Sequence, residues 1–438
     1  MIPTSKRVKF VTLGCKVNQY ETQGMREALD ARGFLETQES GCDFVVINTC
    51  TVTSGADREN RYWIRRMRRE NPEARIVVTG CYVEKNRSEI EAMPEVDLVL
   101  SNYDKDEIAD RLSAGCGAPA AQDAEAVRLK RRTFTPLKIS SFQGKGRAFL
   151  KIQDGCNHAC SFCKVVLVRG RSRSRELADV VEEARRLRDA GYREIVFAGI
   201  QLGAYGLDQG KQNALCEVLE ECSEIEGIER LRLSSIEPTD VRPELIETLR
   251  ALPKCCPHLH IPLQSGDDAV LAGMNRRYGR DFYIDLVREL KAKLTDFSLT
   301  LDVMAGFPGE TEESFENTRA LLRDVRPLKC HVFPYSRRDG TRAAAYSDLP
   351  PATVHERVKF LIALGEELGR RERLAYVGRT FPVLVEKKAA GGLVQGLTPH
   401  YLKVFFQGRE ENVGSIVPVE LLDLEADSFL GRRCGDAL

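Results

Sequence analysis

Short apolar runs alternate with longer amphipathic segments along the first quarter of the chain. The runs at residues 8–13, 44–47, 76–79 and 96–100 have the length and composition of buried strands, and the segments between them have helical spacing. Strands that alternate with helices in this way are typical of an α/β domain with a mainly parallel sheet. We therefore predict such a domain over residues 6–113.

The same alternation returns after a segment without clear periodicity, which we interpret as a linker over residues 114–143. A long charged helix is expected near residues 353–376. Six strand–helix repeats favour a partial barrel of the (β/α)6 type over residues 144–375, with its site at the carboxyl ends of the strands. The six predicted strands are residues 148–152, 194–198, 230–233, 259–262, 299–303 and 329–333.

The pattern changes again in the last part of the chain, where short β runs alternate with turn residues. Runs at 381–385, 393–397, 402–406 and 415–419 predict a small all-β barrel over residues 376–438, an architecture often used on nucleic acid. The predicted fold class is thus α/β, with a parallel-sheet domain, a partial barrel and a small β-barrel in that order.

Composition is that of an ordinary globular chain. Hydrophobic residues make up 42% of the 438 residues and charged residues 30%, which excludes a mostly disordered protein. The 65 basic residues balance 65 acidic ones, so only local clusters can favour a nucleic-acid partner. No apolar run approaches a membrane span, and the first 13 residues lack a signal-peptide core. We expect a cytoplasmic protein without a membrane partner.

Fourteen cysteines are unusual in a reducing compartment, where thiols serve as metal ligands, catalytic groups or core fillers. Cys156, Cys160 and Cys163, here called the barrel set, form a C-x3-C-x2-C spacing directly after the first barrel strand. Thiolates hold iron–sulfur clusters, normally four of them, so three close cysteines would leave one iron open. A zinc site or ordinary loop cysteines are the alternatives. Zinc would show a second ligand pair, which Cys216 and Cys222, six apart on a predicted helix, do not supply.

A second group of cysteines follows the strands of the first domain. Cys15, Cys50 and Cys81, here called the sheet set, come after the first, second and third predicted strands. Because the carboxyl ends of parallel strands meet at one edge of a sheet, we expect these thiols to converge on one crevice. Three separately buried cysteines are the alternative. Cys42 precedes its strand and is expected at the opposite edge.

The residues around both sets resemble the radical S-adenosylmethionine (SAM) superfamily and, within it, the methylthiotransferases. The loop at 154–163 is similar to the superfamily's cluster loop, and residues 12–22, 48–53 and 79–81 are similar to the methylthiotransferase N-terminal domain. The all-β tail is similar to the family's RNA-binding TRAM barrel. The resemblance covers nearly the whole chain and implies two 4Fe–4S clusters, one held by each set.

By this resemblance, the barrel set holds a cluster whose open iron chelates SAM, and reductive cleavage of SAM gives a 5′-deoxyadenosyl radical that abstracts hydrogen. The sheet set holds a cluster that carries the sulfur to be inserted. No side chain is expected to act as a general acid or base. SAM contacts are expected at the strand-end residues Gly199, Ser235 and Glu237, which taken alone are equally compatible with turn chemistry.

The chain departs from the family pattern directly after the barrel set. Most relatives continue with two apolar residues and a proline, whereas this chain has Lys164, Val165 and Val166. A valine at the proline position leaves an extra N–H group, so we expect a looser backbone beside the cluster.

The substrate is indicated by the residues around the first two cysteines. Residues 13–22 and 48–53 resemble the branch that methylthiolates N6-threonylcarbamoyladenosine next to the anticodon of tRNA. The alternatives are the isopentenyl-adenosine branch, the ribosomal-protein branch, and a non-catalytic iron–sulfur protein that binds RNA or senses redox state. The expected partners are the tRNA anticodon stem-loop, an electron donor such as flavodoxin or ferredoxin, and a sulfur source.

Local basic patches agree with an RNA partner, although each is also compatible with a solvated face. Residues 127–153 contain eight Lys or Arg and no acidic residue, and arginines crowd a predicted helix at 58–69. The tail has seven basic and eight acidic residues from 376 onward, so stacking by Tyr401, Phe405 or Phe406 is expected there instead, although two of these three are equally compatible with core positions. The candidate RNA contacts are Arg65, Arg69, Arg131, Arg132, Arg169 and Arg171.

Overall fold

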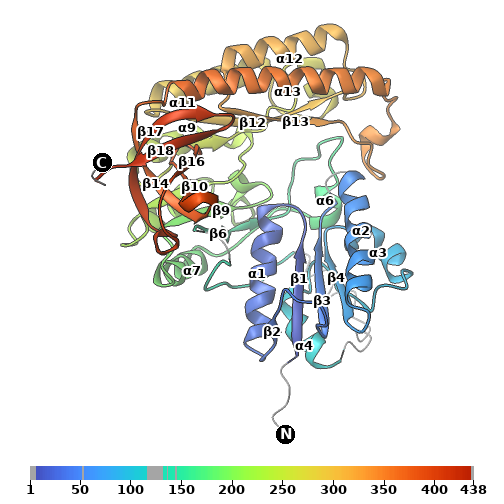
Figure 1. The fold of residues 1–438 in the computed structure, drawn as a ribbon. Helices are drawn as coiled ribbons and strands as arrows, with labels where there is room; N and C mark the ends of the chain where they lie inside the picture. Colours follow the sequence, from blue (N-terminus) through green and yellow to red (C-terminus); the bar gives the residue numbers. More distant parts are fainter. Residues whose placement is uncertain (1–5, 52–53, 116–131, 136, 144–145, 436–438) are drawn as a thin grey trace.

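A computed structural model describes residues 6–51, 54–115, 132–135, 137–143 and 146–435. A parallel-sheet domain, a partial barrel and a small closed barrel follow one another along the chain, coloured from blue through green and yellow to red (Figure 1). This arrangement confirms the predicted fold class. Most of the predicted linker, residues 116–131 and 136, lies outside the described residues.

The first domain is a parallel sheet with helices on both faces, in the strand order β2-β1-β3-β4-β5. Alternate residues of its central strands enter two separate apolar clusters: Val45 and Ile47 in one, Val46 and Val77 in the other. Its elements are β1 (Arg7–Thr12), α1 (Lys16–Asp30), β2 (Leu35–Glu36), β3 (Phe44–Thr49), α2 (Ser54–Glu70), β4 (Arg75–Gly80), α3 (Val83–Glu91), β5 (Leu98–Val99) and α4 (Ile108–Ser113).

The central domain contains six parallel strands in two ladders, β6-β9-β10 and β11-β12-β13, joined by the bridges Leu231–Cys255 and Ser235–His260. No ladder joins β6 to β13 within the described residues, so the barrel is open on that side. The strands are β6 (Ala148–Lys151), β9 (Glu194–Ala198), β10 (Arg230–Leu233), β11 (His258–His260), β12 (Ser298–Ala305) and β13 (Lys329–Pro334). The helices are α7 (Leu177–Asp189), α8 (Ala214–Ser223), α9 (Pro243–Ala251), α10 (Asp268–Gly273), α11 (Arg280–Lys293), α12 (Glu312–Val325) and α13 (Pro351–Leu374).

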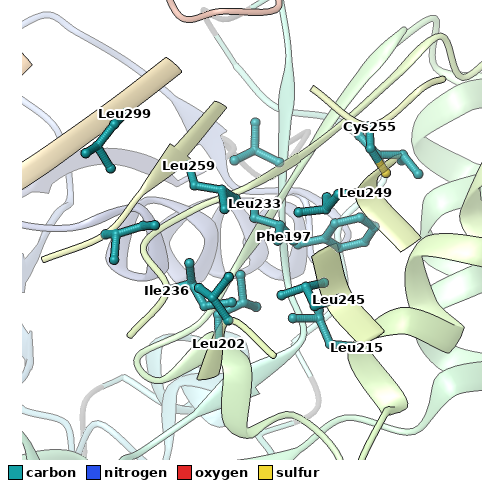
Figure 2. Packing of buried hydrophobic residues seen from close by; sticks show 14 of the residues in the cluster. Phe197, Leu202, Leu215, Leu233, Ile236, Leu245, Leu249, Cys255, Leu259 and Leu299 are labelled. Carbon is teal, nitrogen blue, oxygen red and sulfur yellow. The ribbon is translucent and has the colours of Figure 1, made fainter. Parts of the chain in front are cut away.

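The two faces of this curved sheet differ in chemistry because side chains alternate along each strand. On the outer face, Phe197, Leu233 and Leu259 pack with leucines of the surrounding helices (Figure 2). The alternate positions face the lumen and include polar side chains: Arg232 Nε donates to Glu194 Oε1 at 2.8 Å, although both side chains are buried. Polar groups hidden in this way are stable only because they pair with one another.

The loop of the barrel set is enclosed by a short hairpin and a short helix. Strand β7 (Gln153–Asp154) pairs antiparallel with β8 (Arg173–Ser174), and α6 (Val165–Arg169) lies between them in sequence. The departure after Cys163 is therefore accommodated as a helical turn. Strands of two residues carry no periodicity, which explains why the sequence did not predict this hairpin.

The tail is a closed barrel with the strand order β14-β15-β16-β18-β17, which includes one strand more than the sequence predicted. It docks on the amino-terminal ends of the partial-barrel strands, where the ring of Tyr401 stacks on His258 at 4.7 Å. Tyr401 is therefore an internal contact between domains rather than an exposed RNA-stacking residue. The strands are β14 (Thr380–Lys388), β15 (Leu393–Leu397), β16 (Lys403–Gln407), β17 (Ile416–Glu425) and β18 (Ser428–Arg433).

Candidate functional site

A cavity of about 250 Å³ lies where the carboxyl ends of both parallel sheets meet. The first domain contributes the sheet set, and the partial barrel contributes Cys163 and the ends of β9, β11, β12 and β13. Active sites of open α/β sheets and of (β/α) barrels form at this end of the strands. The lining residues are Cys15, Cys50, Thr51, Cys81, Phe162, Cys163, Lys164, Val165, Val168, Arg169, Ile200, Gln264, Asp302, Met304, Phe333, Pro334, Ser336 and Arg338.

Topology brings the sheet set together. Cys50 and Cys81 follow β3 and β4 directly, and Cys15 stands at the start of α1. Two glycines permit the close approach of these loops. Gly14 has φ +93°, and a Cβ there would lie 2.6 Å from the Cβ of Cys50. Gly80 has φ +103°, and its Cβ would lie 2.4 Å from the carbonyl oxygen of Thr49. Only glycine fits either position.

The barrel set occupies one loop, and backbone N–H groups point at two of its sulfurs. His158 N–H donates to Cys156 Sγ at 3.3 Å, and Val165 N–H donates to Cys163 Sγ at 3.4 Å. Gln201 Oε1, which follows β9, lies 3.3 Å from Cys156 Sγ. N–H donors beside ligand sulfurs are typical of iron–sulfur sites, where they tune the reduction potential. The donors of this loop therefore fit a thiolate-held cluster.

Burial raises the pKa of several of these thiols. It raises the pKa of Cys156 to about 12 and that of Cys163 to about 11, and the nearby carboxylate of Glu237 adds to both shifts. Burial also raises the pKa of Cys81, while the Arg169 guanidinium opposes that shift. Metal ligands must be deprotonated, so loading these sites releases protons. Among the described residues, no three His, Cys, Asp or Glu side chains converge as ligands of one ion would.

The three candidate SAM residues lie at strand ends on the same side of the barrel as the cysteine loop. Gly199 follows β9, and Ser235 and Glu237 follow β10. A Cβ at Gly199 would lie 2.9 Å from Oε1 of Gln153. This oxygen accepts hydrogen bonds from the backbone N–H groups of residues 200 and 201. Glu237 is paired with Arg276 at 2.5 Å, a contact that no sequence spacing indicated. None of the three candidates lines the 250 Å³ cavity.

The candidate RNA contacts fall into two classes. Arg65, Arg69, Arg132 and Arg171 are exposed, whereas Arg131 lies outside the described residues. Arg169 is fully buried, and its guanidinium contacts Cys81, Glu21 and Asn18. A side chain in that position offers no surface to a phosphate, which corrects the prediction for Arg169. Arginine in a basic run suggests exposure, and the partners of Arg169 are too distant in sequence to indicate otherwise.

Two cations on the cavity wall were not predicted from the sequence as site residues. Arg338 is buried, and its Nη2 donates to Thr51 Oγ1 and Asp57 Oδ2, each at 2.7 Å, which ties the barrel to the first domain. Its Nε is buried without a hydrogen-bond partner among the described residues. Lys164 is half-buried, and the described part of the chain offers its Nζ no ion pair. Only the fold places these side chains beside the cysteines.

Family models match the chain in three consecutive stretches. The TRAM domain matches residues 374–432, the radical SAM superfamily matches residues 150–322, and the uncharacterized protein family UPF0004 matches residues 7–101. The radical SAM match implies SAM and a 4Fe–4S cluster as cofactors. No helix among the described residues is long and apolar enough to cross a membrane.

Relatives match along almost the whole chain. The threonylcarbamoyladenosine tRNA methylthiotransferase MtaB of Bacillus subtilis is 39% identical over 95% of this chain and 93% of its own length. The tRNA-2-methylthio-N(6)-dimethylallyladenosine synthase of Acidothermus cellulolyticus is 33% identical over 97% and 89%. The radical SAM methyltransferase TsrM of Kitasatospora setae, solved with cobalamin and a [4Fe-4S] cluster, shares the fold with a TM-score of 0.54 at 18% identity, over 90% and 81%. The chain therefore belongs to the radical SAM tRNA methylthiotransferase family.

Proposed function

We propose that this enzyme adds a methylthio group to C2 of N6-threonylcarbamoyladenosine next to the anticodon of tRNA. The observation that carries the proposal is the match of 39% identity over 95% of the chain to an enzyme named for that substrate. The dimethylallyladenosine synthase matches over a similar length at 33%. The cavity supports the same reaction class, because all three cysteines of the sheet set and Cys163 of the barrel set line it.

The proposed cofactors are SAM and two 4Fe–4S clusters. Cys156, Cys160 and Cys163 would hold one cluster, with SAM contacted by Gly199, Ser235 and Glu237, and Cys15, Cys50 and Cys81 would hold the other. When bound, the first cluster with SAM supplies radical hydrogen abstraction and the second supplies the sulfur. The chain's own contribution is to bind, orient and exclude water. Phe162, Ile200 and Met304 line the cavity with apolar side chains, which protects a radical from side reactions.

The charge of the cavity wall supports the threonylcarbamoyl substrate over an isopentenyl one. A threonyl group carries a carboxylate, which an isopentenyl group lacks. Lys164 lines the cavity with no ion pair among the described residues, and the buried Arg338 beside it keeps one N–H free. Asp302 also lines the cavity, but its carboxylate already has a partner, since its Oδ2 lies 3.2 Å from His260 Nε2. We propose that Lys164 binds the threonyl carboxylate.

Two tRNAs of one sequence, with and without the threonylcarbamoyl group, test the role of Lys164. The wild type is expected to prefer the modified tRNA, Lys164→Met to lose at least tenfold of that preference, and Lys164→Arg to keep it. Lys85→Met is the matched control, because Lys85 is a neighbouring exposed lysine that does not line the cavity. A Lys164→Met protein that keeps both its iron and its full preference contradicts this role.

The tRNA is proposed to contact an exposed stripe of α2. Tyr62, Arg65 and Arg69 recur at the three- and four-residue spacing of one helix face; Tyr62 is 52% exposed and the Arg65 side chain is 60% exposed. An aromatic ring among guanidinium groups suits nucleic acid. Arg132 and Arg171 are further exposed candidates.

The salt dependence of tRNA binding tests this surface. In the double variant Arg65→Glu with Arg69→Glu, the negative slope of log affinity against log salt is expected to become shallower by about one unit per lost phosphate contact. The control Arg288→Glu, on α11, is expected to leave the slope unchanged.

Nucleoside analysis of tRNA tests the function as a whole. We expect a strain without this gene to lose methylthio-threonylcarbamoyladenosine and to regain it from the wild-type gene. Unchanged levels would overturn the proposal. Loss of the methylthio-isopentenyl nucleoside or of a methylthio-aspartate in a ribosomal protein would assign the enzyme to another branch. Intact modification together with cluster binding, and no 5′-deoxyadenosine from reduced protein, would indicate a non-catalytic iron–sulfur protein.

The remaining partners are proposed from the chemistry. Reductive cleavage of SAM needs a one-electron donor such as flavodoxin or ferredoxin, and each turnover needs a sulfur source. A tRNA substrate and a labile cluster suit the cytoplasm, which keeps thiols reduced. We propose the domain limits 6–113, 144–375 and 376–438 for truncation studies.

A further inference from the structure

Arg169 is the last residue of α6 and lies six positions after Cys163. The residue is 0% exposed, and its side chain lies where the first domain meets the partial barrel. Guanidinium groups are rarely buried unless every donor is paired. The contacts of this side chain therefore indicate what holds it there.

All three nitrogens of the guanidinium donate to groups on both domains. Nε donates to Cys81 Sγ at 3.1 Å, and Nη2 donates to Asn18 Oδ1 at 2.6 Å. Nη1 reaches Glu21 Oε1 at 2.8 Å and Asp154 Oδ1 at 3.1 Å. Asp154 stands two residues before Cys156, so one side chain connects the loop of the barrel set to a thiol of the sheet set.

The charges joined through these contacts do not balance. Lys105 and Lys151 bind Glu21, Lys151 and Arg173 bind Asp154, and all of these side chains are buried. With Arg169 there are four cations, while the ion pairs of the described residues supply only two carboxylates. Buried positive charge is costly without a counterion. The Cys81 sulfur, which accepts the Arg169 Nε–H bond at 3.1 Å, is the remaining partner of these cations, and as a ligand of a cluster it would carry the negative charge of a thiolate.

We propose that Arg169 is a positioning residue that orients Cys81 and raises the reduction potential of the cluster assigned to the sheet set. The inference rests on the proposed function, because it requires that second cluster. A hydrogen bond and a positive charge at a ligand sulfur stabilise the more electron-rich, reduced state of a cluster. The reduced form is therefore favoured when Arg169 is present.

The experiment measures one-electron reduction of the sheet-set cluster alone. Cys156, Cys160 and Cys163 are changed together to serine, the full-length protein is reconstituted without oxygen, and its potential is followed by electron paramagnetic resonance. Arg169→Met is expected to lower the equilibrium constant for reduction at least tenfold, which is 59 mV for a one-electron couple. Arg169→Lys, which keeps a charge but cannot reproduce the fork, is expected to lie between the two.

Arg173→Met is the matched control. Arg173 is buried and binds the same Asp154 carboxylate at 2.8 Å, but the described structure gives it no sulfur contact. An equal shift in Arg173→Met and Arg169→Met, or no shift in either, overturns the inference. If Arg169→Met binds no iron, Arg169→Lys decides: a wild-type potential overturns the inference and a lowered one supports it. If the triple-serine protein binds no iron while Arg169 is intact, the second cluster itself is refuted, and the inference with it.

Discussion

The two cysteine sets contribute to the same cavity, but the chain assembles them in different ways. The barrel set lies within eight residues of one loop, so its local sequence carries the spacing. The sheet set spans 67 residues and meets only because three parallel strands end at one edge. A local site depends on its own loop, whereas a topological site depends on the integrity of a domain. The sheet set should therefore be the more sensitive to changes made far from any cysteine.

The largest expected effect comes from the barrel set. Cys156→Ala should reduce 5′-deoxyadenosine formation by reduced protein about a thousandfold or more, since SAM cleavage requires the cluster that this thiol is proposed to hold. The measurement is chromatographic detection of 5′-deoxyadenosine. Cys222→Ala, buried on α8, serves as the control. Intact cleavage in Cys156→Ala would remove the radical assignment.

A second substitution separates the roles of the two sets. Cys50→Ala should lower the methylthio product about a hundredfold or more, while 5′-deoxyadenosine still forms, because the sheet set is proposed to supply sulfur and not the radical. Mass spectrometry of the tRNA nucleosides measures the product. Cys42→Ala is the matched control, since Cys42 is buried at the opposite edge of the sheet beside Asn71. Equal loss of both activities would show that the sets act as one unit.

The dependence of the sheet set on its domain is tested at Gly80. Gly80→Ala should destabilise the first domain by about 4 kcal/mol, since alanine is strained at φ +103° and its Cβ meets the Thr49 backbone. The only tryptophan of the chain, Trp63 on α2, reports unfolding of this domain in urea by its fluorescence. Gly33→Ala, at φ +80° with open space around it, should cost about 1 kcal/mol. Equal losses would mean that close packing at Gly80 is unimportant.

Acid should loosen the first domain through Glu21. Burial opposes ionisation of Glu21, but Arg169, Lys105 and Lys151 hold its pKa well below the usual range. The stabilisation is present above the unfolded pKa of about 4.3 and is lost as the pH falls below it. Glu21→Gln should cost about 3 kcal/mol at pH 7 by Trp63 fluorescence and flatten the acid limb. Exposed Glu73→Gln should do neither; a steep acid limb in Glu21→Gln would contradict this account.

The sequence predicts those parts of the fold that depend on a repeating pattern of apolar and polar residues. The apolar runs of β3 and β4 are buried throughout, which confirms the prediction of buried strands in a mainly parallel sheet. Strand β10 is confirmed at the predicted residues 230–233, and its Arg-Leu-Arg-Leu sequence places arginines in the lumen and leucines on the apolar outer face. The position of Arg169 could not be predicted, because Glu21 lies 148 residues away and meets it only across a domain interface.

The docking of Tyr401 has a consequence for experiments on the tail. The guanidinium groups of Arg147 and Arg232 lie 5.3 and 5.2 Å from the centre of the Tyr401 ring. A cavity beside this ring is lined by residues at the starts of β6 and β13, the two strands that no ladder joins in the described structure. The tail thus covers a lumen that holds Glu194. Burial alone would raise the pKa of Glu194, but Arg232 and Arg147 lower it to about 2. Deleting residues 376–438 would admit solvent to that lumen. An inactive truncated enzyme would therefore be explained equally well by solvent in the barrel lumen and by lost RNA binding. Single substitutions on the outer surface of the tail separate these two causes.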